Sequence, residues 1–469
     1  MKNTKILALN LALRPESPVK IFPVGLAYVL SSVKRAGYEL ELFDIDLGRY
    51  SYDRVIDKIS EKKWDIVLLG CIVTGYKVVK KVVSEIRRHN PACLIVVGNS
   101  VASSIPDILL SKTEADVAVI GEGDVTAVEI VENWGRKRDL SVIKGIYYKL
   151  DGEIRKNGKR EVISDISSIK HPIYDIFNVE EYIKAHRNMV GEPLPMEREL
   201  IRSFPINTAR GCINHCTFCY HCFIGDKYRF RSASSIVEEI KNLKRLYGIN
   251  YIHLWDDLTF FYLKQIDEFV NLLLKESLDV YWVAAIRGNL FQSDSHLELL
   301  EKMKKSGCLS LGYALESADP NILRDMKKNV SLRQFSRQKE LLDKADIQSV
   351  TSIVLGYPRE TPETIAKTYQ FCLNVGMYPS TGYLLPQPAT PIYQWAVKEG
   401  IISDEESYLI RLGDRQDLRI NLTKMSDQEF NETVMFWLKK LNRELNIGLD
   451  EKNLIKTQFK RDRKEEANL

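Results

Sequence analysis

The sequence predicts an α/β protein with two consecutive domains of different architecture. Three observations favour this fold class. Short apolar runs alternate with amphipathic segments over residues 5–135, and a second alternation of the same kind begins near residue 206. Buried parallel strands read as continuous apolar runs, and the helices that connect them read as amphipathic segments. The third observation is the length of 469 residues, which exceeds what a single hydrophobic core usually serves.

The first alternation predicts a doubly wound, Rossmann-like domain over residues 1–140. Its apolar runs lie at 5–9, 39–44, 66–70, 94–98 and 117–120, with helical patterns between them. In an open parallel sheet, ligands bind beyond the carboxyl ends of the strands. Small and polar residues lie at these ends and leave room for a bulky ligand: Pro23, Gly25, Thr74, Gly98, Asn99, Gly121 and Glu122.

Residues 141–195 are predicted to form a linker that contains a small hairpin. The regular alternation stops there, and strand-like runs at 146–150 and 153–155 flank Asp151 and Gly152. An Asp-Gly pair between two strand-like runs is a strong hairpin signal.

The second alternation predicts a partial (β/α)6 TIM-like barrel over residues 196–398. Its strands are expected near 206–209, 251–255, 281–285, 309–315, 348–355 and 382–385, with helical patterns between them. In such barrels, function clusters on the face where the strands end. The remaining segment, 399–469, is charged and helical, and we expect it to form a cap or lid.

Three cysteines follow the first strand of this barrel: Cys212, Cys216 and Cys219, in the spacing C-x3-C-x2-C. A closed tetrahedral metal site needs four protein ligands, whereas an iron–sulfur cube held by three thiolates leaves one iron free for a further ligand. Cys222 extends the pattern by a fourth thiol. A zinc knuckle or a closed four-cysteine cluster is therefore an alternative.

The cysteine spacing, with Phe218 directly before the third cysteine, resembles the cluster motif of the radical S-adenosylmethionine (SAM) superfamily. The preceding Arg-Gly pair is most similar to that of its cobalamin-binding subgroup. The resemblance implies that the three cysteines are the metal ligands and catalytic residues, holding a [4Fe-4S] cluster, and that Phe218 lies at the cofactor. It also implies that SAM binds the free iron and is cleaved to a 5′-deoxyadenosyl radical.

Further segments at the strand ends resemble motifs of the same superfamily, in the right order. Asp256 and Asp257 are implied to pair with the ammonium group of SAM, and Arg287 is implied to bind its carboxylate. Glu316 is implied to accept hydrogen bonds from the ribose, and Gly356 to let the backbone approach the adenine. The alternatives are helix caps for the aspartates and a surface position for the arginine.

The first domain resembles the cobalamin-binding domain that precedes many radical SAM domains. The resemblance rests on P-x-G-L-A from Pro23, V-V-G ending at Gly98, and G-E-G-D from Gly121. One departure is the absence of a D-x-H-x-x-G motif, since His89 is the only histidine in this domain. A histidine is therefore not expected to coordinate cobalt from the usual loop, and a domain that binds no corrinoid is the alternative. In the barrel, Ala389 stands where the family has glycine.

The implied function is cobalamin-dependent methylation of an unactivated carbon, or of phosphorus, in a small metabolite. A non-methylating radical SAM reaction, such as cyclisation, ring contraction or carbon–carbon bond formation, is the runner-up. The rival from another class is a non-catalytic protein that binds an iron–sulfur cluster or zinc. The expected partners are a small-molecule substrate and an external electron donor such as flavodoxin or ferredoxin.

Composition excludes some other classes of function. The net charge of +4 is small for this length and charges of both signs are interspersed, so a nucleic-acid partner is not expected. No apolar stretch is long enough to span a membrane, and the N-terminus does not look like a secretory signal. Eight cysteines without an export signal indicate a reducing compartment, so we expect a cytoplasmic protein.

Overall fold

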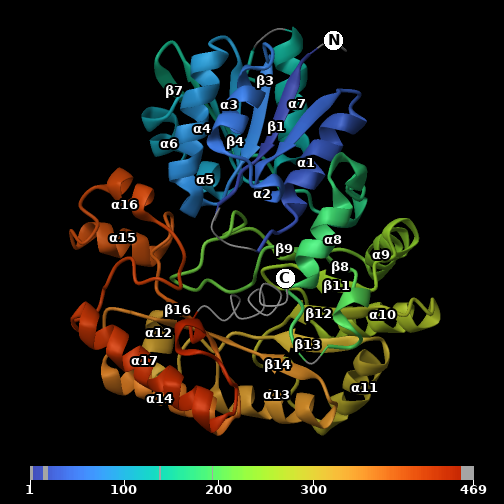
Figure 1. Cartoon of the computed structure of the whole chain (residues 1–469), viewed down its shortest axis with the longest axis vertical. Coiled ribbons are helices and arrows are strands. Elements are labelled where there is room, and N and C mark those ends of the chain that lie inside the picture. Colours follow the sequence, from blue (N-terminus) through green and yellow to red (C-terminus); the bar gives the residue numbers. More distant parts are fainter. Residues whose placement is uncertain (1–3, 14–18, 137–138, 193, 456–469) are drawn as a thin grey trace. The chain divides into compact units, whose positions relative to one another are not determined.

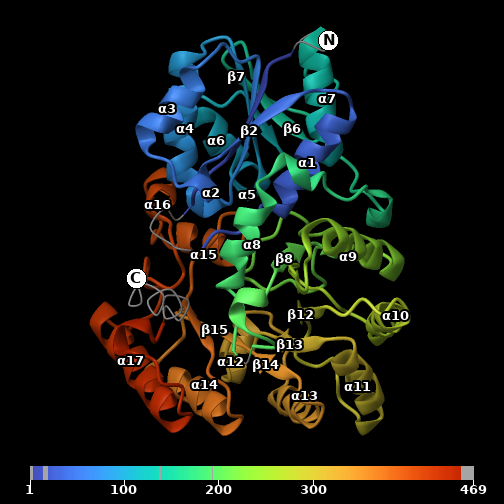
Figure 2. The same cartoon turned by 45° about the vertical axis from the view of Figure 1, so that its right-hand side comes forward.

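A computed structural model describes residues 4–13, 19–136, 139–192 and 194–455 of the chain (Figures 1 and 2). The chain divides into two compact units. The first comprises Met1–Tyr182, Tyr220–Asp226 and Gln387–Gly413, and the second comprises Ile183–Cys219, Lys227–Pro386 and Asp414–Leu469. The chain therefore enters and leaves each unit several times, which the linear domain boundaries predicted from sequence do not capture.

The first unit is built on a seven-stranded sheet in the order β2-β1-β3-β4-β5-β6-β7. The five leading strands are parallel, as predicted: β1 (Ile6–Asn10), β2 (Leu40–Asp44), β3 (Ile66–Gly70), β4 (Leu94–Gly98) and β5 (Val117–Val119). Every residue of β1 is buried, which is the pattern expected of a central parallel strand. The doubly wound prediction is confirmed.

Helices cover both faces of this sheet. On one face α1 (Val24–Arg35) and α7 (Gly123–Arg136) lie side by side, and on the other α3 (Tyr52–Ser60) packs beside α4 (Tyr76–His89) (Figures 1 and 2). Helix α4 buries Val79, Val83 and Ile86, whose spacing places them on one stripe. The shorter helices are α2 (Ile45–Gly48), α5 (Asn99–Ser104) and α6 (Pro106–Lys112).

The hairpin predicted within the linker is part of this sheet. β6 (Ile146–Leu150) pairs antiparallel with β5, and β7 (Glu153–Lys156) pairs antiparallel with β6. Asp151 and Gly152 both have positive φ, at 52° and 80°, as a tight hairpin turn requires. The segment that follows also belongs to the first unit, because Phe22 packs against the rings of Tyr174, Phe177 and Tyr182. Much of the stretch predicted as a linker is therefore part of the first domain.

The second unit has the predicted partial barrel. Its five-stranded parallel sheet has the order β14-β13-β12-β11-β8, with β8 (Ser203–Ile206), β11 (Tyr251–Leu254), β12 (Tyr281–Ala285), β13 (Cys308–Gly312) and β14 (Gln348–Val350). β15 (Ser352–Leu355) pairs in parallel with β16 (Ser380–Tyr383). The predicted fifth strand is split at Thr351, and a single bridge between Glu316 and Ile353 continues the barrel wall there.

Helices connect these strands on the outside of the barrel (Figure 1). In chain order they are α9 (Ala233–Tyr247), α10 (Leu263–Lys275), α11 (Leu297–Lys305), α12 (Pro320–Asp325), α13 (Leu332–Lys344) and α14 (Pro362–Asn374). Helix α8 (Val179–Arg187) precedes the first strand. None of the described helices is both long and apolar enough to cross a membrane.

The segment predicted as a cap is shared between the units. α15 (Pro391–Lys398) and α16 (Glu405–Arg411) belong to the first unit, where the Tyr76 hydroxyl donates to Glu406 over 3.0 Å. α17 (Asp427–Glu444) packs against α14 in the second unit. Ala389, at the position where glycine was expected, has φ of +66°, so its backbone does adopt the left-handed conformation that glycine favours. Residues 456–469 lie outside the described residues.

Removing the Tyr182 hydroxyl is expected to destabilise the first unit by about 1–3 kcal/mol. Tyr182 donates to Asp44 Oδ2 over 2.7 Å, and Asn10 Nδ2 donates to Asp44 Oδ1 over 2.8 Å. A Tyr182→Phe change leaves Oδ2 of this half-buried carboxylate without the phenol donor, while Oδ1 keeps its bond from Asn10. Tyr52→Phe, which removes an exposed bond to Glu85, is the control and should cost less than about 0.5 kcal/mol. Denaturant unfolding measures both, and equal losses would contradict the assignment.

Candidate functional site

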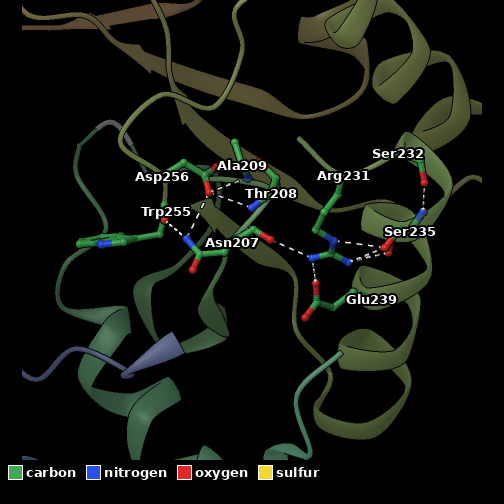
Figure 3. A network of polar contacts seen from close by, with 9 residues as sticks. All are labelled: Asn207, Thr208, Ala209, Arg231, Ser232, Ser235, Glu239, Trp255 and Asp256. Atoms are coloured by element: carbon green, nitrogen blue, oxygen red, sulfur yellow. Dashed lines mark hydrogen bonds and ion pairs between the residues drawn. The ribbon is translucent and has the colours of Figure 1, made fainter. Parts of the chain in front are cut away.

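The carboxylate of Asp256 fixes the segment that leads into the cysteine loop (Figure 3). Asp256 follows β11, and its Oδ1 accepts hydrogen bonds from the backbone N–H of Thr208 at 2.8 Å and of Ala209 at 3.0 Å. Its Oδ2 accepts from the Thr208 hydroxyl at 2.6 Å, and Asn207 Nδ2 donates to Oδ1 at 3.1 Å. Four donors on one carboxylate leave the segment from Asn207 to Ala209 little conformational freedom.

The other end of the loop is fixed by Arg231. Its guanidinium forms a buried ion pair with Glu239, donates to the Asn207 carbonyl at 2.8 Å, and donates to the Ser235 carbonyl at 2.9 Å (Figure 3). Both charged side chains of the pair are at most 3% exposed. The short antiparallel strands β9 (Ala209–Arg210) and β10 (Arg229–Phe230) pair at the same place. The cysteine loop therefore starts and ends on one rigid base.

The three predicted thiols lie within eight residues of this loop, from Cys212 to Cys219. Cys212 and Cys216 are half-buried and Cys219 is exposed. Burial raises the pKa of the Cys216 thiol, the charge of Lys328 lowers it, and Glu316 and Cys212 raise it further. The groups whose charges act on Cys219 include Asp257, Cys216 and Cys212. Cys222, the alternative fourth ligand, belongs to the first unit, whereas the three thiols belong to the second.

Thr217 lies between Cys216 and Cys219 and is held from three directions. Its N–H donates to the Met326 carbonyl at 2.9 Å, and its hydroxyl donates to the Asp325 carbonyl at 2.8 Å. The same hydroxyl lies 2.9 Å from the phenol oxygen of Tyr357. The neighbouring Phe218 packs edge-on against the Tyr357 ring, with 6.3 Å between ring centres. The barrel wall thus braces the middle of the loop.

Glu316 lies shortly after β13 in a left-handed backbone conformation. Its φ is +65°, which costs an L-residue other than glycine of order 1–3 kcal/mol. Its Oε1 accepts from Lys328 Nζ at 3.2 Å, and its buried Oε2 has no hydrogen-bond partner among the described residues. Burial lowers the pKa of Lys328, but Glu316 and Cys216 raise it more, so the ammonium stays charged. Glu316 therefore offers one free acceptor.

Two more of the predicted site residues are charged. Arg287 follows β12, its guanidinium carbon lies 4.5 Å from the centre of the Phe261 ring, and its Nε has no partner in the described part of the chain. Asp257 is exposed, unlike the neighbouring Asp256. A stacked guanidinium with an unused donor is suited to a carboxylate ligand.

Gly356 follows β15 with φ of +112°, a backbone conformation that other residues rarely adopt. Its N–H and that of Tyr357 donate to Glu360 Oε2 at 2.5 Å and 3.2 Å. Glu360 is 1% exposed, and its other carboxyl oxygen, Oε1, has no hydrogen-bond partner within the described residues. Burial is the main reason that the pKa of Glu360 is raised to about 7, while the two backbone donors lower it. The turn is therefore held by a carboxyl group that titrates near neutrality.

In the first unit, the residues predicted to bind a bulky ligand lie at one edge of the sheet, since each follows a parallel strand or begins the next helix. Gly25, Gly98 and Gly121 have open space where a side chain would project, with no atom of the described residues within 4 Å of the added carbon. Asn99 has φ of +68°. The Oε2 of Glu122 accepts a hydrogen bond from the Ile163 N–H at 2.7 Å. Pro23 precedes α1, and Thr74 lies in the short turn of helix after β3.

Two known domain families match the chain. The family described as B12 binding domain matches residues 12–131, and the Radical SAM superfamily matches residues 206–372. The chain is a radical SAM protein with an N-terminal B12-binding domain. Its cofactors are accordingly a [4Fe-4S] cluster, SAM and cobalamin.

Sequence relatives span most of this radical SAM protein. An uncharacterized methyltransferase of Pyrococcus horikoshii is 27% identical over 409 residues, which cover 85% of each chain. Cytidylyl-2-hydroxyethylphosphonate methyltransferase of Streptomyces wedmorensis is 23% identical and covers 95% of this chain and 90% of its own. The anaerobic magnesium-protoporphyrin IX monomethyl ester cyclase of Cereibacter sphaeroides is 26% identical and covers 89% and 67%.

A solved structure has the same fold. The radical SAM methyltransferase TsrM of Kitasatospora setae, determined with cobalamin and a [4Fe-4S] cluster, superposes with a TM-score of 0.67 at 18% identity. The match covers 85% of this chain and 78% of TsrM. The two-domain α/β architecture predicted from sequence is confirmed.

The radical SAM domain offers donors that fit its cofactors. The three thiols lie in one braced loop, and thiolates are the ligands of iron–sulfur clusters. The unpartnered Glu316 Oε2 and Arg287 Nε suit the hydroxyl and carboxylate groups of SAM. In the B12-binding domain, no atom of the described residues lies where a side chain would project at Gly25, Gly98 and Gly121, so these positions leave room for a ligand. The individual contacts to SAM and cobalamin stay predictions.

The structure adds two observations to what the sequence motif indicated. Asp256, which is predicted to pair with the ammonium of SAM, accepts hydrogen bonds from the protein's own segment from Asn207 to Ala209. The pairing of Asp256 and of the exposed Asp257 with SAM stays a prediction. Lys328 was not singled out from the sequence, because a lysine in a Met-Lys-Lys run carries no signal that distinguishes it from a surface lysine.

Asp256→Asn is expected to destabilise the radical SAM domain by about 1–3 kcal/mol, because an amide cannot accept all four hydrogen bonds. The loosened loop should also hold less iron per chain after anaerobic reconstitution. The matched control is Asp257→Asn, which should leave unfolding unchanged within about 0.5 kcal/mol and retain full iron. If both variants lose iron equally, Asp256 is not the residue that positions the loop.

The stability of the radical SAM domain should fall as pH rises from about 4.5 to about 7. The pKa of Glu360 is raised from 4.5 to about 7 in the folded protein, so the folded state binds the proton more tightly than the unfolded state does. The linked loss is about 3 kcal/mol. Glu360→Gln should remove this slope, measured by denaturant unfolding across the range. Glu363→Gln, at an exposed site three residues later in the first turn of α14, should keep it.

Proposed function

We propose that the protein is a cobalamin-dependent radical SAM methyltransferase that transfers a methyl group to a carbon or phosphorus atom of a small molecule. The observation that carries the proposal is the presence in one chain of a three-thiol loop and an open B12-binding edge. Support comes from relatives along most of the chain, two of which bear the name methyltransferase.

The roles of the chain's own residues follow from their chemistry. Cys212, Cys216 and Cys219 would hold the cluster, which supplies the electron that cleaves SAM. Arg287 would bind the carboxylate of SAM through a charge-assisted hydrogen bond, and Glu316 would accept from its ribose. A buried carboxylate oxygen without a hydrogen-bond donor costs free energy. Glu316 Oε2 therefore favours binding of a ligand group that can donate a hydrogen bond.

We further propose two aspects of the setting. The electron comes from an external one-electron donor, such as a flavodoxin or a ferredoxin. The reaction takes place in the cytoplasm, because all eight cysteines are free thiols and a reducing compartment preserves thiols and iron–sulfur clusters.

A non-methylating reaction is the second candidate. The relative from Cereibacter sphaeroides is a cyclase and covers 89% of this chain. The two candidates differ in their products, because methylation adds one carbon and two hydrogens to the substrate and cyclisation does not.

Replacing Cys212, Cys216 or Cys219 by alanine is expected to abolish the cluster, whereas Cys222→Ala should retain it. The reason is that three thiolates suffice for a cluster with one open iron. Iron content, visible absorbance and the change in the electron paramagnetic resonance spectrum when SAM is added measure this. Loss of iron in Cys222→Ala equal to that in Cys216→Ala would argue for a closed, non-catalytic cluster.

The reaction type is tested by incubating the anaerobically reconstituted protein with SAM, a reductant and hydroxocobalamin. Formation of 5′-deoxyadenosine together with retained corrinoid supports the methyltransferase. Deoxyadenosine without retained corrinoid favours the non-methylating candidate, and the absence of both favours a protein that only binds the cluster.

A further inference from the structure

A partly buried positive charge lies in the segment that is bonded to the cysteine loop. The Lys328 side chain is 15% exposed and pairs with Glu316, whose side chain is 7% exposed. Lys328 follows Asp325 and Met326, whose carbonyl groups bind Thr217 in the cysteine loop. Lysine is rarely buried unless it is paired or performs a function. The carboxylate explains the pairing, but not why the pair lies in the segment that is bonded to this loop.

The segment that carries this lysine is fastened directly to the cysteine loop. At the end of α12, the carbonyl of Asp325 accepts from the hydroxyl of Thr217, and the carbonyl of Met326 accepts from its N–H. Asp325 also pairs with Arg359, and the N–H of Lys328 donates to the Leu323 carbonyl at 2.9 Å. The ammonium group and the loop are therefore parts of one hydrogen-bonded assembly, in which their separation is set by the fold.

We propose that Lys328 is a positioning residue that raises the reduction potential of the [4Fe-4S] cluster. An external donor gives the cluster one electron, so the net charge of the cluster becomes more negative by one. A fixed cation nearby stabilises the more negative state, and the effect is strong where water is largely excluded. Net charge and the polar groups around the sulfurs are known determinants of cluster potential. Glu316, of opposite sign, acts in the opposite direction.

This inference rests on the proposed function, since it presumes a cluster on the three thiols. It goes further by assigning a residue to the electron-transfer step. It also separates two effects of one ion pair: Glu316 would serve the bound nucleoside, whereas Lys328 would serve the metal centre.

The test compares Lys328→Met with Lys327→Met in the full-length chain, reconstituted anaerobically. Both variants remove one positive charge from adjacent positions, but Lys327 is exposed. The midpoint potential of the cluster is measured by electron paramagnetic resonance during a redox titration without SAM, so enzymatic activity does not enter. Lys328→Met should lower the ratio of reduced to oxidised cluster at a fixed potential by about tenfold, which is about 59 mV for one electron. Lys327→Met should change it less than about twofold, which is about 18 mV by the same relation.

Two further variants protect the test against an unstable protein. Lys328→Arg keeps the charge and should keep the potential. Glu316→Gln removes the opposing charge and should raise the potential, whether or not Lys328→Met holds its cluster. An unchanged potential in Lys328→Met with full iron content overturns the proposal, even if SAM binding weakens. A potential that is unchanged or lower in Glu316→Gln overturns it too. A wild-type chain that assembles no cluster would instead refute the proposed function itself.

Discussion

Hydrogen bonds to the Asp256 carboxylate fix the base from which the cysteine loop projects, and the rest of the site depends on that base. A loop that must present three thiolates to one cofactor brings like charges together, which the chain resists without a rigid support. Here the support comes from both ends of the loop, through Asp256 on one side and the buried pair of Arg231 and Glu239 on the other. The ordering entropy of the loop ends is thus lost on folding rather than on cofactor binding.

The barrel adds a second support at the middle of the loop. Thr217 is held by the end of α12 and lies against Tyr357, which follows β15. Tyr357 also donates its N–H to Glu360, the carboxyl group that closes the turn at Gly356. Thr217 and Tyr357 therefore connect the cysteine loop with the turn at Gly356. The loop is predicted to hold the cluster, and the turn is predicted to lie at the adenine of SAM. Changes in the turn are expected to reach the loop through packing rather than through charge.

Much of this organisation could be predicted from the sequence, because apolar periodicity and strand-end motifs are local signals. The five parallel strands of the first sheet appear where the apolar runs place them. In the barrel, the first strand ends at Ile206 instead of beginning there, and the predicted fifth strand is split into β14 and β15. The position of the hairpin at Asp151 was also predictable, but its membership of the first sheet was not, since pairing with β5 depends on tertiary contacts. The split of the segment after residue 387 between two units is equally a tertiary property.

The chemistry of single side chains was less predictable than the fold. A pair of aspartates reads alike in sequence, yet Asp256 is saturated by the protein's own donors and Asp257 is exposed. The strained φ of Glu316 is visible only in the folded chain, and it agrees with the motif that singled the residue out. Such strain persists where the surrounding structure and a function both require the conformation.

The same distinction applies to the charges around the thiols. Asp257 and Glu316 both place negative charge near Cys219, which makes any further negative charge there more costly. A ligand that carries an ammonium group and hydroxyls is bound well by carboxylates. The same carboxylates make a negatively charged metal centre less favourable, unless a positive charge offsets them. The partly buried Lys328, paired with Glu316, supplies the opposite charge. The placement of one ion pair between two binding functions thus follows from the conflicting electrostatic demands of a nucleoside and a reducible cluster.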